Sequence, residues 1–276
     1  MTEKEFDRIV RYMADRYGMD MRKKKVIIEG RMDHYIASKG YHTYDAYMDD
    51  MEKDATGREA QNIIDMLTTN HTYFLREPEH FDYFRSTILP ELKEKENENG
   101  TKVLRIWCAA SSSGEEPYTI AMVLKDFFGL EYEKWDTDIL ATDISRKVLE
   151  AALHGVYSRD QLSRIPERWL RSNFKKVDET TYQVKPEIRK KVMFRQFNLM
   201  SALPFRHRLH VVFLRNVMIY FDDATKRELL DRIYDVLEPG GYLIIGITES
   251  IPKKECKFEY IGNSIYRKAA GCGGRD

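Results

Sequence analysis

"WCAASSSGEEPY" (residues 107–118) lies between two apolar stretches of different periodicity. The apolar run at 103–106 predicts a buried strand, and the apolar positions over 120–124 predict a helix. A strand, a turn of small residues and a helix form the nucleotide pocket of many α/β proteins. This turn has one glycine, Gly114, whereas a dinucleotide-binding turn has three. The stretch therefore predicts an α/β fold whose pocket takes a different ligand.

Two glutamates at the start of the predicted helix restrict that ligand. Glu115 and Glu116 occupy the helix N-terminus, where a negative charge already interacts favourably with the helix dipole. A phosphate would meet two carboxylates there, so NAD and ATP do not fit. S-adenosylmethionine, which carries a sulfonium and an ammonium group, does fit. The alternative is that the glutamates only stabilise the start of the helix.

Strand-like and helical runs alternate from residue 103 onward, which predicts a parallel sheet covered by helices. In "LEPGGYLII" (237–245) we expect a helix to stop at Pro239 and a strand to follow the glycines. "FEYIGNSIYRK" (258–268) predicts a hairpin, so the last strands are expected to be antiparallel. The stretch 158–191, with the strand-like "TTYQV", fits neither pattern and predicts a small inserted subdomain.

The N-terminal part differs, because its apolar residues recur at helical spacing and glycines separate the segments. A polar run, "ELKEKENENG" (91–100), then predicts a helix end and linker. We expect a helical domain over 1–85, a linker helix over 86–100, an α/β domain over 101–268 with its β-subdomain at about 160–192, and a flexible tail over 269–276.

Composition excludes several classes of protein. No apolar run is long enough to cross a membrane, and the N-terminus lacks the apolar core of a signal peptide. Three widely spaced cysteines (Cys108, Cys256 and Cys272) suit neither a disulfide framework nor a zinc site, so we expect a cytoplasmic protein without a metal. Forty-five basic residues balance forty-five acidic ones, which argues against a dedicated nucleic-acid binder.

Charge is nevertheless uneven along the helical part. Residues 21–40 are predominantly basic and residues 41–60 predominantly acidic. These segments are either the solvated faces of two neighbouring helices, or a basic helix that docks an acidic partner. The basic residues of interest are Arg22, Lys23, Lys24, Lys25 and Arg31.

Polar residues follow the predicted strands, at the sheet edge where α/β proteins bind ligands. Asp143 ends the second strand, where a carboxylate can accept hydrogen bonds from ribose hydroxyls. Its alternative role is to cap the next helix, but Ser145 can fill that role itself. Asn198 ends the third strand, and the pair Arg215–Asn216 ends the fourth.

A further polar segment, "TTNHTYFLREPEHF" (68–81), lies outside the predicted sheet. Its threonines and asparagine are suited to end one helix, and Glu77–Pro78 to start the next. Arg76, a cation among aromatic and aliphatic residues, calls for an anionic partner. A ligand carboxylate, such as that of a methionine moiety, would provide one.

These segments together resemble the bacterial chemotaxis receptor methyltransferases, the CheR family, from about residue 2 to 268. The motifs are "TTNHTYFLRE", "WCAASSSGEEPY", "ATDIS", "FLRNVMIYF" and "LEPGGYL", in this order. The resemblance implies a helical domain joined to a class I S-adenosylmethionine-dependent methyltransferase domain with an inserted antiparallel β-subdomain. By this resemblance the cofactor site is lined by Asn70, Thr72, Arg76, Glu115, Asp143, Asn198, Leu199, Arg215 and Asn216.

The family reaction transfers a methyl group to receptor glutamates and leaves S-adenosylhomocysteine. A glutamate has a pKa of about 4.3 and is already ionised at pH 7, so no general base is required. The resemblance places Tyr220 near the methyl group, and we expect Arg76 and Tyr220 to act as orienting groups.

The receptors' methylated regions are acidic helical bundles, so the basic segment is expected to dock them. Family members that tether to a receptor tail tend to have a longer, glycine-containing loop in the β-subdomain. "SNFKKVDETTYQVKPE" (172–187) has no glycine, so we do not expect tethering. We expect no direct membrane insertion and no nucleic-acid partner.

Two other functions fit the residues alone. One is a methyltransferase of the same fold that acts on RNA or a small metabolite, which would require a contiguous basic surface with stacking groups or a closed apolar pocket. The other is a non-catalytic, cofactor-sensing module that binds receptors.

Overall fold

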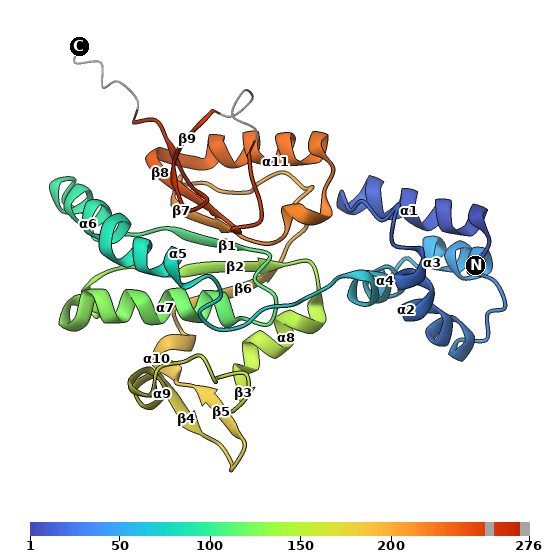
Figure 1. Cartoon of the computed structure of the whole chain (residues 1–276), viewed down its shortest axis with the longest axis horizontal. Helices are drawn as coiled ribbons and strands as arrows, with labels where there is room; N and C mark the ends of the chain where they lie inside the picture. The colour runs from blue at the N-terminus through green and yellow to red at the C-terminus, as the bar shows by residue number, and fades with distance from the viewer. Residues whose placement is uncertain (252–256, 271–276) are drawn as a thin grey trace.

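The computed structural model describes residues 1–251 and 257–270, which form a helical domain and an α/β domain (Figure 1). The helical domain consists of α1 (Glu3–Tyr17), α2 (Lys25–Ser38), α3 (Tyr44–Lys53) and α4 (Arg58–Leu67). Thr2 and Glu5 form a capping box at the start of α1, and Gly18 ends this helix with a φ of 67°. The predicted helical character of this region is confirmed.

The α/β domain contains a seven-stranded sheet in the order β6-β2-β1-β7-β8-β10-β9. Its strands are β1 (Ile106–Ala109), β2 (Ile139–Asp143), β6 (Val192–Gln196), β7 (Leu209–Leu214), β8 (Leu237–Ile245), β9 (Phe258–Gly262) and β10 (Ile265–Lys268). The first five strands in this order are parallel, whereas β10 is antiparallel to both of its neighbours, β8 and β9. The parallel sheet and its antiparallel end are both confirmed.

Successive side chains of β1 enter two different hydrophobic clusters because strand residues alternate between sheet faces. Ile106 and Cys108 join a cluster with α5 (Pro78–Tyr83), η1 (Phe84–Ile88), α6 (Leu89–Glu98) and α7 (Glu115–Phe128). Trp107 and Ala109 join a cluster that contains α11 (Asp223–Val236) and also α1 to α4. The segment expected to be a linker helix thus packs against the sheet through α6.

The inserted subdomain is also present. It contains β3 (Val156–Ser158), α9 (Glu167–Asn173), β4 (Phe174–Lys176), β5 (Thr181–Val184) and α10 (Pro186–Arg189), and its sheet order is β3-β5-β4. All pairs in this sheet are antiparallel. The sequence indicated only β5, because β3 and β4 have three residues each and are too short to show an alternating pattern.

One prediction about β8 was wrong. The preceding helix ends at Val236, and Pro239 lies within the strand, not at the helix end. The pairing of β8 with β7 shifts register after Leu209, and Gly240 has a φ of 79°. Pro239 and the glycines therefore form an irregularity in the strand, where a proline is tolerated.

The remaining elements are η2 (Gly129–Lys134), α8 (Arg146–His154) and η3 (Met218–Tyr220). No helix within the described residues has the length and apolar character needed to span a bilayer. Cys108 is a buried free thiol, whereas Cys256, Cys272 and residues 271–276 of the predicted tail lie outside the described residues.

Candidate active site

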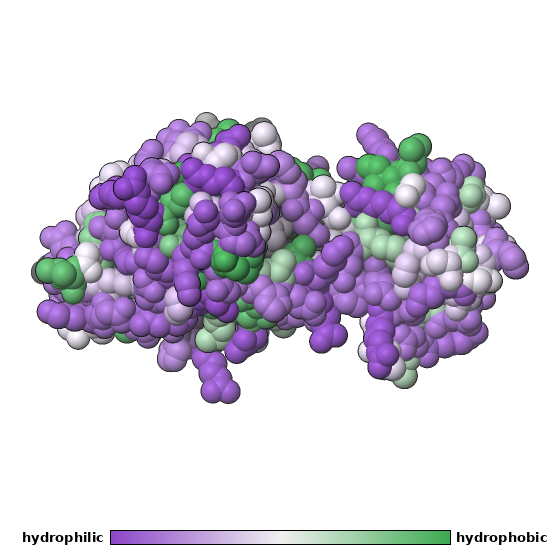
Figure 2. All heavy atoms as spheres, turned by 90° about the horizontal axis from the view of Figure 1, so that it is seen from below, coloured by the Kyte–Doolittle hydropathy of each residue, from purple (hydrophilic) through white to green (hydrophobic). Residues whose placement is uncertain are grey.

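A cavity lies at the carboxyl ends of the parallel strands, and both domains contribute to its wall. The space within it, including the part that is open to solvent, is about 1100 Å³. The space-filling view of Figure 2, from below, shows the two domains joined by a narrow waist. The helical domain contributes Tyr17, Met19, Met21, Lys24, Ile27 and the start of the loop after α4.

The turn after β1 is tight and well anchored. Ala110, Ser112 and Gly114 all have positive φ values, of 61°, 48° and 97°. A Cβ atom at Gly114 would lie 2.9 Å from both the Ala152 methyl and the Tyr157 hydroxyl, so only glycine fits this position. The turn therefore brings the backbone close to α8 and the subdomain before α7 begins.

Asp143, at the end of β2, is buried and lines the cavity. Its carboxylate accepts hydrogen bonds from the amides of Ser112 (2.8 Å) and Ser145 (2.9 Å), and burial raises its pKa. The Ser145 hydroxyl accepts a hydrogen bond from the Val148 amide and caps α8, as the sequence predicted. An ionised carboxylate has about four acceptor sites, so Asp143 retains capacity for ribose hydroxyls.

The two glutamates of the turn have different surroundings. Glu116 lines the cavity, accepts hydrogen bonds from Cys108 Sγ (3.0 Å) and forms an ion pair with Arg215. Glu115, which the sequence placed in the cofactor site, does not line the cavity, because neighbouring helix residues point about 100° apart. Its carboxylate is buried against the Ser113 hydroxyl at 2.7 Å, and burial raises its pKa.

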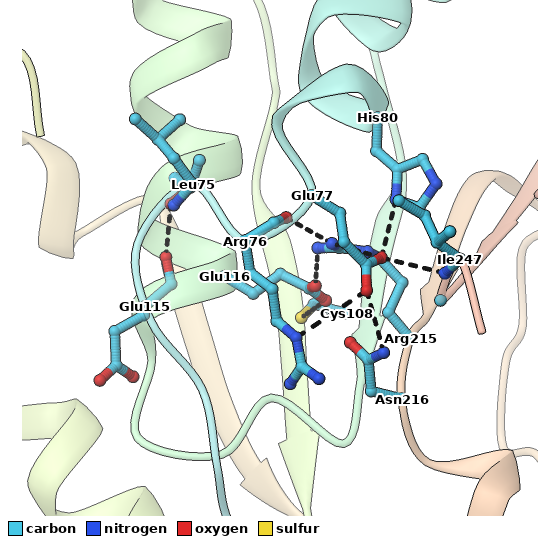
Figure 3. Close-up of polar contacts among 12 residues, drawn as sticks. Leu75, Arg76, Glu77, His80, Cys108, Glu115, Glu116, Arg215, Asn216 and Ile247 are labelled. Carbon is cyan, nitrogen blue, oxygen red and sulfur yellow. Dashed lines mark hydrogen bonds and ion pairs between the residues drawn. The ribbon is translucent and has the colours of Figure 1, made fainter. Parts of the chain in front are cut away.

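The loop between α4 and α5 contributes Asn70, Thr72 and Arg76 to the cavity wall. Arg76 Nη1 donates to the His71 carbonyl at 2.7 Å, and its guanidinium lies over the Tyr73 ring. Its nearest carboxylate among the described residues is that of Glu77, with 3.9 Å between Nε and Oε1. Arg76 therefore has donors available for an anionic ligand (Figure 3).

Asn198, Leu199, Arg215 and Asn216 follow β6 and β7, and all four line the cavity. The Asn198 side chain is engaged by the protein, since it donates to the Arg16 carbonyl and accepts from the Met200 amide. The Arg215 side chain is only 1% exposed and is paired with Glu77 and Glu116. Arg215 is therefore held in place by two buried ion pairs, and its guanidinium has almost no contact with solvent.

Tyr220, in η3, also lines the cavity. Its hydroxyl donates to the Thr69 carbonyl at 3.1 Å, and its backbone carbonyl accepts from the Asp20 amide. Burial raises the pKa of Tyr220, so the hydroxyl is protonated at neutral pH and can donate a hydrogen bond. Tyr220 therefore joins the loop after α4 to the segment between α1 and α2.

The basic segment is arranged differently from the prediction. Helix α2 begins at Lys25, so Arg22, Lys23 and Lys24 lie in the preceding turn. Arg31, expected to dock an acidic partner, donates instead to the carbonyls of Met66, Leu67 and Thr68, because the last carbonyls of α4 have no partner within that helix. Arg22 forms an ion pair with Asp20, and Lys25 forms one with Glu3. Among the described residues, Lys23 and Lys24 have no such pair. Lys23 is exposed on the surface, and Lys24 lines the cavity.

The sequence analysis missed three features of this site: the carboxylates of Glu77 and Glu249 and an apolar wall from the helical domain. Glu77 was interpreted as a helix start, although it bonds to Arg215 and Asn216. Glu249 follows β8 and accepts hydrogen bonds from the amides of Asn216, Gly246 and Ile219. The rule that found Asp143, a polar residue beyond a strand end, would also have found Glu249. The apolar wall from the helical domain had no comparable signal.

The strand order, the acid at the end of β2 and the cavity at the strand ends define an α/β protein with a site for a nucleoside-containing ligand. A family model described as CheR methyltransferase, SAM binding domain, matches residues 70–267, and the CheR methyltransferase all-alpha domain matches residues 4–68. The chain belongs to the CheR methyltransferase family.

Similar proteins include the chemotaxis protein methyltransferase of Borreliella burgdorferi, 37% identical over 270 residues, which are 97% of this chain and 95% of that protein. The chemotaxis protein methyltransferase of Escherichia coli is 32% identical over 275 residues, 96% of this chain and 91% of that protein. Chemotaxis protein methyltransferase 1 of Pseudomonas aeruginosa is 34% identical over 232 residues, 83% of each chain.

Proposed function

We propose that this protein transfers a methyl group from S-adenosylmethionine to glutamate side chains of chemotaxis receptors, in the cytoplasm next to the membrane. Membership of the CheR family supports the reaction. The cavity shared by the two domains is the observation that best supports this site as the place of the reaction. Within it, Arg76 and Asp143 offer a donor and an acceptor that the protein itself does not saturate.

The chemistry of the wall fits the cofactor, which supplies an electrophilic methyl group on a sulfonium. Arg76 suits the methionine carboxylate, because a guanidinium pairs with a carboxylate through two hydrogen bonds. Asp143 suits the ribose hydroxyls, and Asn70 and Thr72 lie on the same wall as Arg76. Glu116 also lines the cavity, and its charge is paired with that of Arg215.

The acceptor glutamate needs no base because it is already ionised. The protein's part is to align the carboxylate and to remove water from it. Met19, Met21 and Ile27 supply an apolar wall on the side of the helical domain, and the Tyr220 hydroxyl is a protonated donor beside it. Lys23 and Lys24 are the proposed contacts with the acidic receptor surface, replacing the wider basic helix expected from the sequence.

The test is to incubate the protein with methyl-labelled S-adenosylmethionine and membranes that contain chemotaxis receptors. Base-labile label on the receptor, lost when receptor glutamates are changed to alanine, would support a glutamyl methyl ester. Label on RNA or on a small metabolite would support the same fold with another acceptor. Cofactor binding without any label would support a non-catalytic module.

A further inference from the structure

A cluster of charged side chains at the cavity wall joins three separate segments (Figure 3). Arg215, after β7, pairs with Glu77, before α5, and with Glu116, in the first turn of α7. The guanidinium has almost no contact with solvent, and its Nη2 also donates to the Arg76 carbonyl. Removing one partner from a buried pair leaves an uncompensated charge, so these contacts constrain all three segments.

Glu77 also connects separate segments of the chain in this cluster. Its carboxylate accepts hydrogen bonds from Arg215 Nη2 (3.0 Å), Asn216 Nδ2 (3.1 Å) and the Ile247 amide (3.2 Å). One side chain thus ties the end of the loop that carries Arg76 to the turns after β7 and β8. Burial alone would raise the pKa of Glu77, but Arg215, Asn216 and the Ile247 amide hold it below its usual range.

The backbone at Glu77 adopts a conformation that is unfavourable for a residue other than glycine. Its φ is 56°, in the left-handed region that costs a non-glycine residue roughly 1 kcal/mol. Leu75 has the same φ, so the backbone on both sides of Arg76 is left-handed. Such a conformation persists only where surrounding contacts fix it, and the Glu77 carboxylate supplies those contacts.

We propose that Glu77 is a positioning residue for cofactor binding, acting through Asn216 and through the loop that carries Arg76. Glu77 does not line the cavity, whereas Asn216 and Arg76 both do. The carboxylate sets the direction of the Asn216 amide and fixes the backbone next to Arg76. This inference rests on the cofactor placement proposed above and is independent of which molecule accepts the methyl group.

The test measures the affinity for S-adenosylhomocysteine by calorimetry, together with the melting temperature, and needs no methyl acceptor. Glu77→Gln keeps the size of the side chain but removes its charge, and we expect affinity to fall about tenfold, the scale of one charge-assisted hydrogen bond. Glu79→Gln, on the exposed face of α5, is the matched control and should bind as the parent does. Glu77→Asp keeps the charge beside Arg215 but shortens the reach to Asn216, so it should fold and still bind weakly.

A double-mutant cycle separates positioning from general stability. Asn216→Gly tolerates the φ of 57° at this position and removes the amide that Glu77 holds. If Glu77 acts partly through Asn216, the loss of affinity in the double variant should be smaller than the sum of the losses in the two single variants. Additive losses, or a Glu77→Asp variant that binds as tightly as the parent, would overturn the proposal. If the parent binds S-adenosylhomocysteine but methylates no receptor, the proposed acceptor is wrong. The double-mutant cycle still tests the role of Glu77, because it measures only cofactor affinity.

Discussion

At the scale of single residues, the carboxylates of this site are held by backbone amides as well as by cations. Asp143 and Glu249 each accept hydrogen bonds from amides of neighbouring loops, and Glu249 thereby joins the turn after β7 to the end of β8. A Cβ atom at Gly246 would lie 2.4 Å from Nδ2 of the Asn216 side chain, so any larger residue there would displace that side chain. Sequence found Asp143 from its place after a strand, but it could not show which loops each carboxylate would join.

His80 predicts a pH dependence of stability. It is fully buried, its Nε2 lies 2.8 Å from the Asn263 carbonyl and its Nδ1 lies 3.4 Å from Glu77. Burial, assisted by the charge of Arg215, lowers the pKa of His80. The unfolded chain therefore binds the proton more readily, so this contribution to stability is complete above about pH 6.5 and declines as the pH falls below it.

We expect the melting temperature of the parent to fall between pH 7.5 and pH 5.5, and His80→Gln to show a smaller fall. Comparing the two proteins cancels the contributions of buried acids such as Glu249, whose raised pKa has the opposite sign. The exposed His42→Gln variant is the control. Equal slopes for His80→Gln and the parent would show that His80 does not titrate with unfolding.

Tyr220→Phe tests the proposed orienting hydroxyl. The change removes the hydrogen bond to the Thr69 carbonyl but keeps the ring, so we expect cofactor affinity to stay near that of the parent. Turnover should fall roughly tenfold, about the effect of one hydrogen bond, because the bond that fixes the tyrosine against the loop after α4 is lost. Unchanged turnover would remove Tyr220 from the mechanism.

Arg76→Lys tests the proposed contact with the methionine carboxylate. Lysine keeps the charge but cannot form two parallel hydrogen bonds, so we expect the KM for S-adenosylmethionine to rise about tenfold. A kinetic titration of cofactor at fixed receptor concentration measures this. An unchanged KM would assign the carboxylate to another donor.

At the scale of elements, helix ends explain much of what the sequence concealed. The periodicity of the apolar residues predicted the helices correctly, because it depends only on local geometry. It could not show that Arg31, in α2, donates to the carbonyls at the end of α4, since that contact joins residues more than thirty positions apart. A residue that resembled a surface charge in the sequence is thus part of the helical domain's internal packing.

Arg31→Gln should therefore lower stability more than it changes receptor docking. Three carbonyls and the Thr69 hydroxyl lose a charged donor, and we expect a loss of about 1–3 kcal/mol. Thermal unfolding measures the effect, with the exposed Arg58→Gln at the start of α4 as the control. A parent-like melting temperature together with a raised KM for receptor would return Arg31 to the docking surface.

At the scale of the whole molecule, the two domains share one hydrophobic cluster. Trp107 and Val212, on one face of the sheet, belong to the same cluster as Ile9 and Met32 of the helical domain. Contact at Gly18 is close, since a Cβ atom there would lie 2.5 Å from the Met200 sulfur. The sequence predicted both domains, but not this shared packing, because no local pattern records which distant surfaces meet.

Docking of an acidic receptor predicts sensitivity to charge and salt. Lys23→Glu with Lys24→Glu should raise the KM for receptor about tenfold or more. Because Lys24 lines the cavity, cofactor affinity is compared for Lys23→Glu alone, which should bind S-adenosylhomocysteine within about threefold of the parent. Lys175→Glu with Lys176→Glu, two exposed positions on β4, makes the same change in net charge and should have little effect. If both pairs raise KM equally, docking depends on overall charge and not on the turn before α2.

The shared cavity wall has a consequence for how the protein should resist proteases. A ligand that touches Ile27 and Tyr17 on one side and Asp143 on the other adds its binding energy to the cohesion between the domains. Residues 68–77 connect the two domains. For this segment to unfold locally, the ligand must lose its contacts with both domains at once. With S-adenosylhomocysteine at one hundred times its Kd, opening that requires release of the ligand is opposed by about 2.7 kcal/mol. Cleavage of this connection should therefore slow by about a hundredfold, while nicking of the subdomain hairpin between β4 and β5 continues at its former rate.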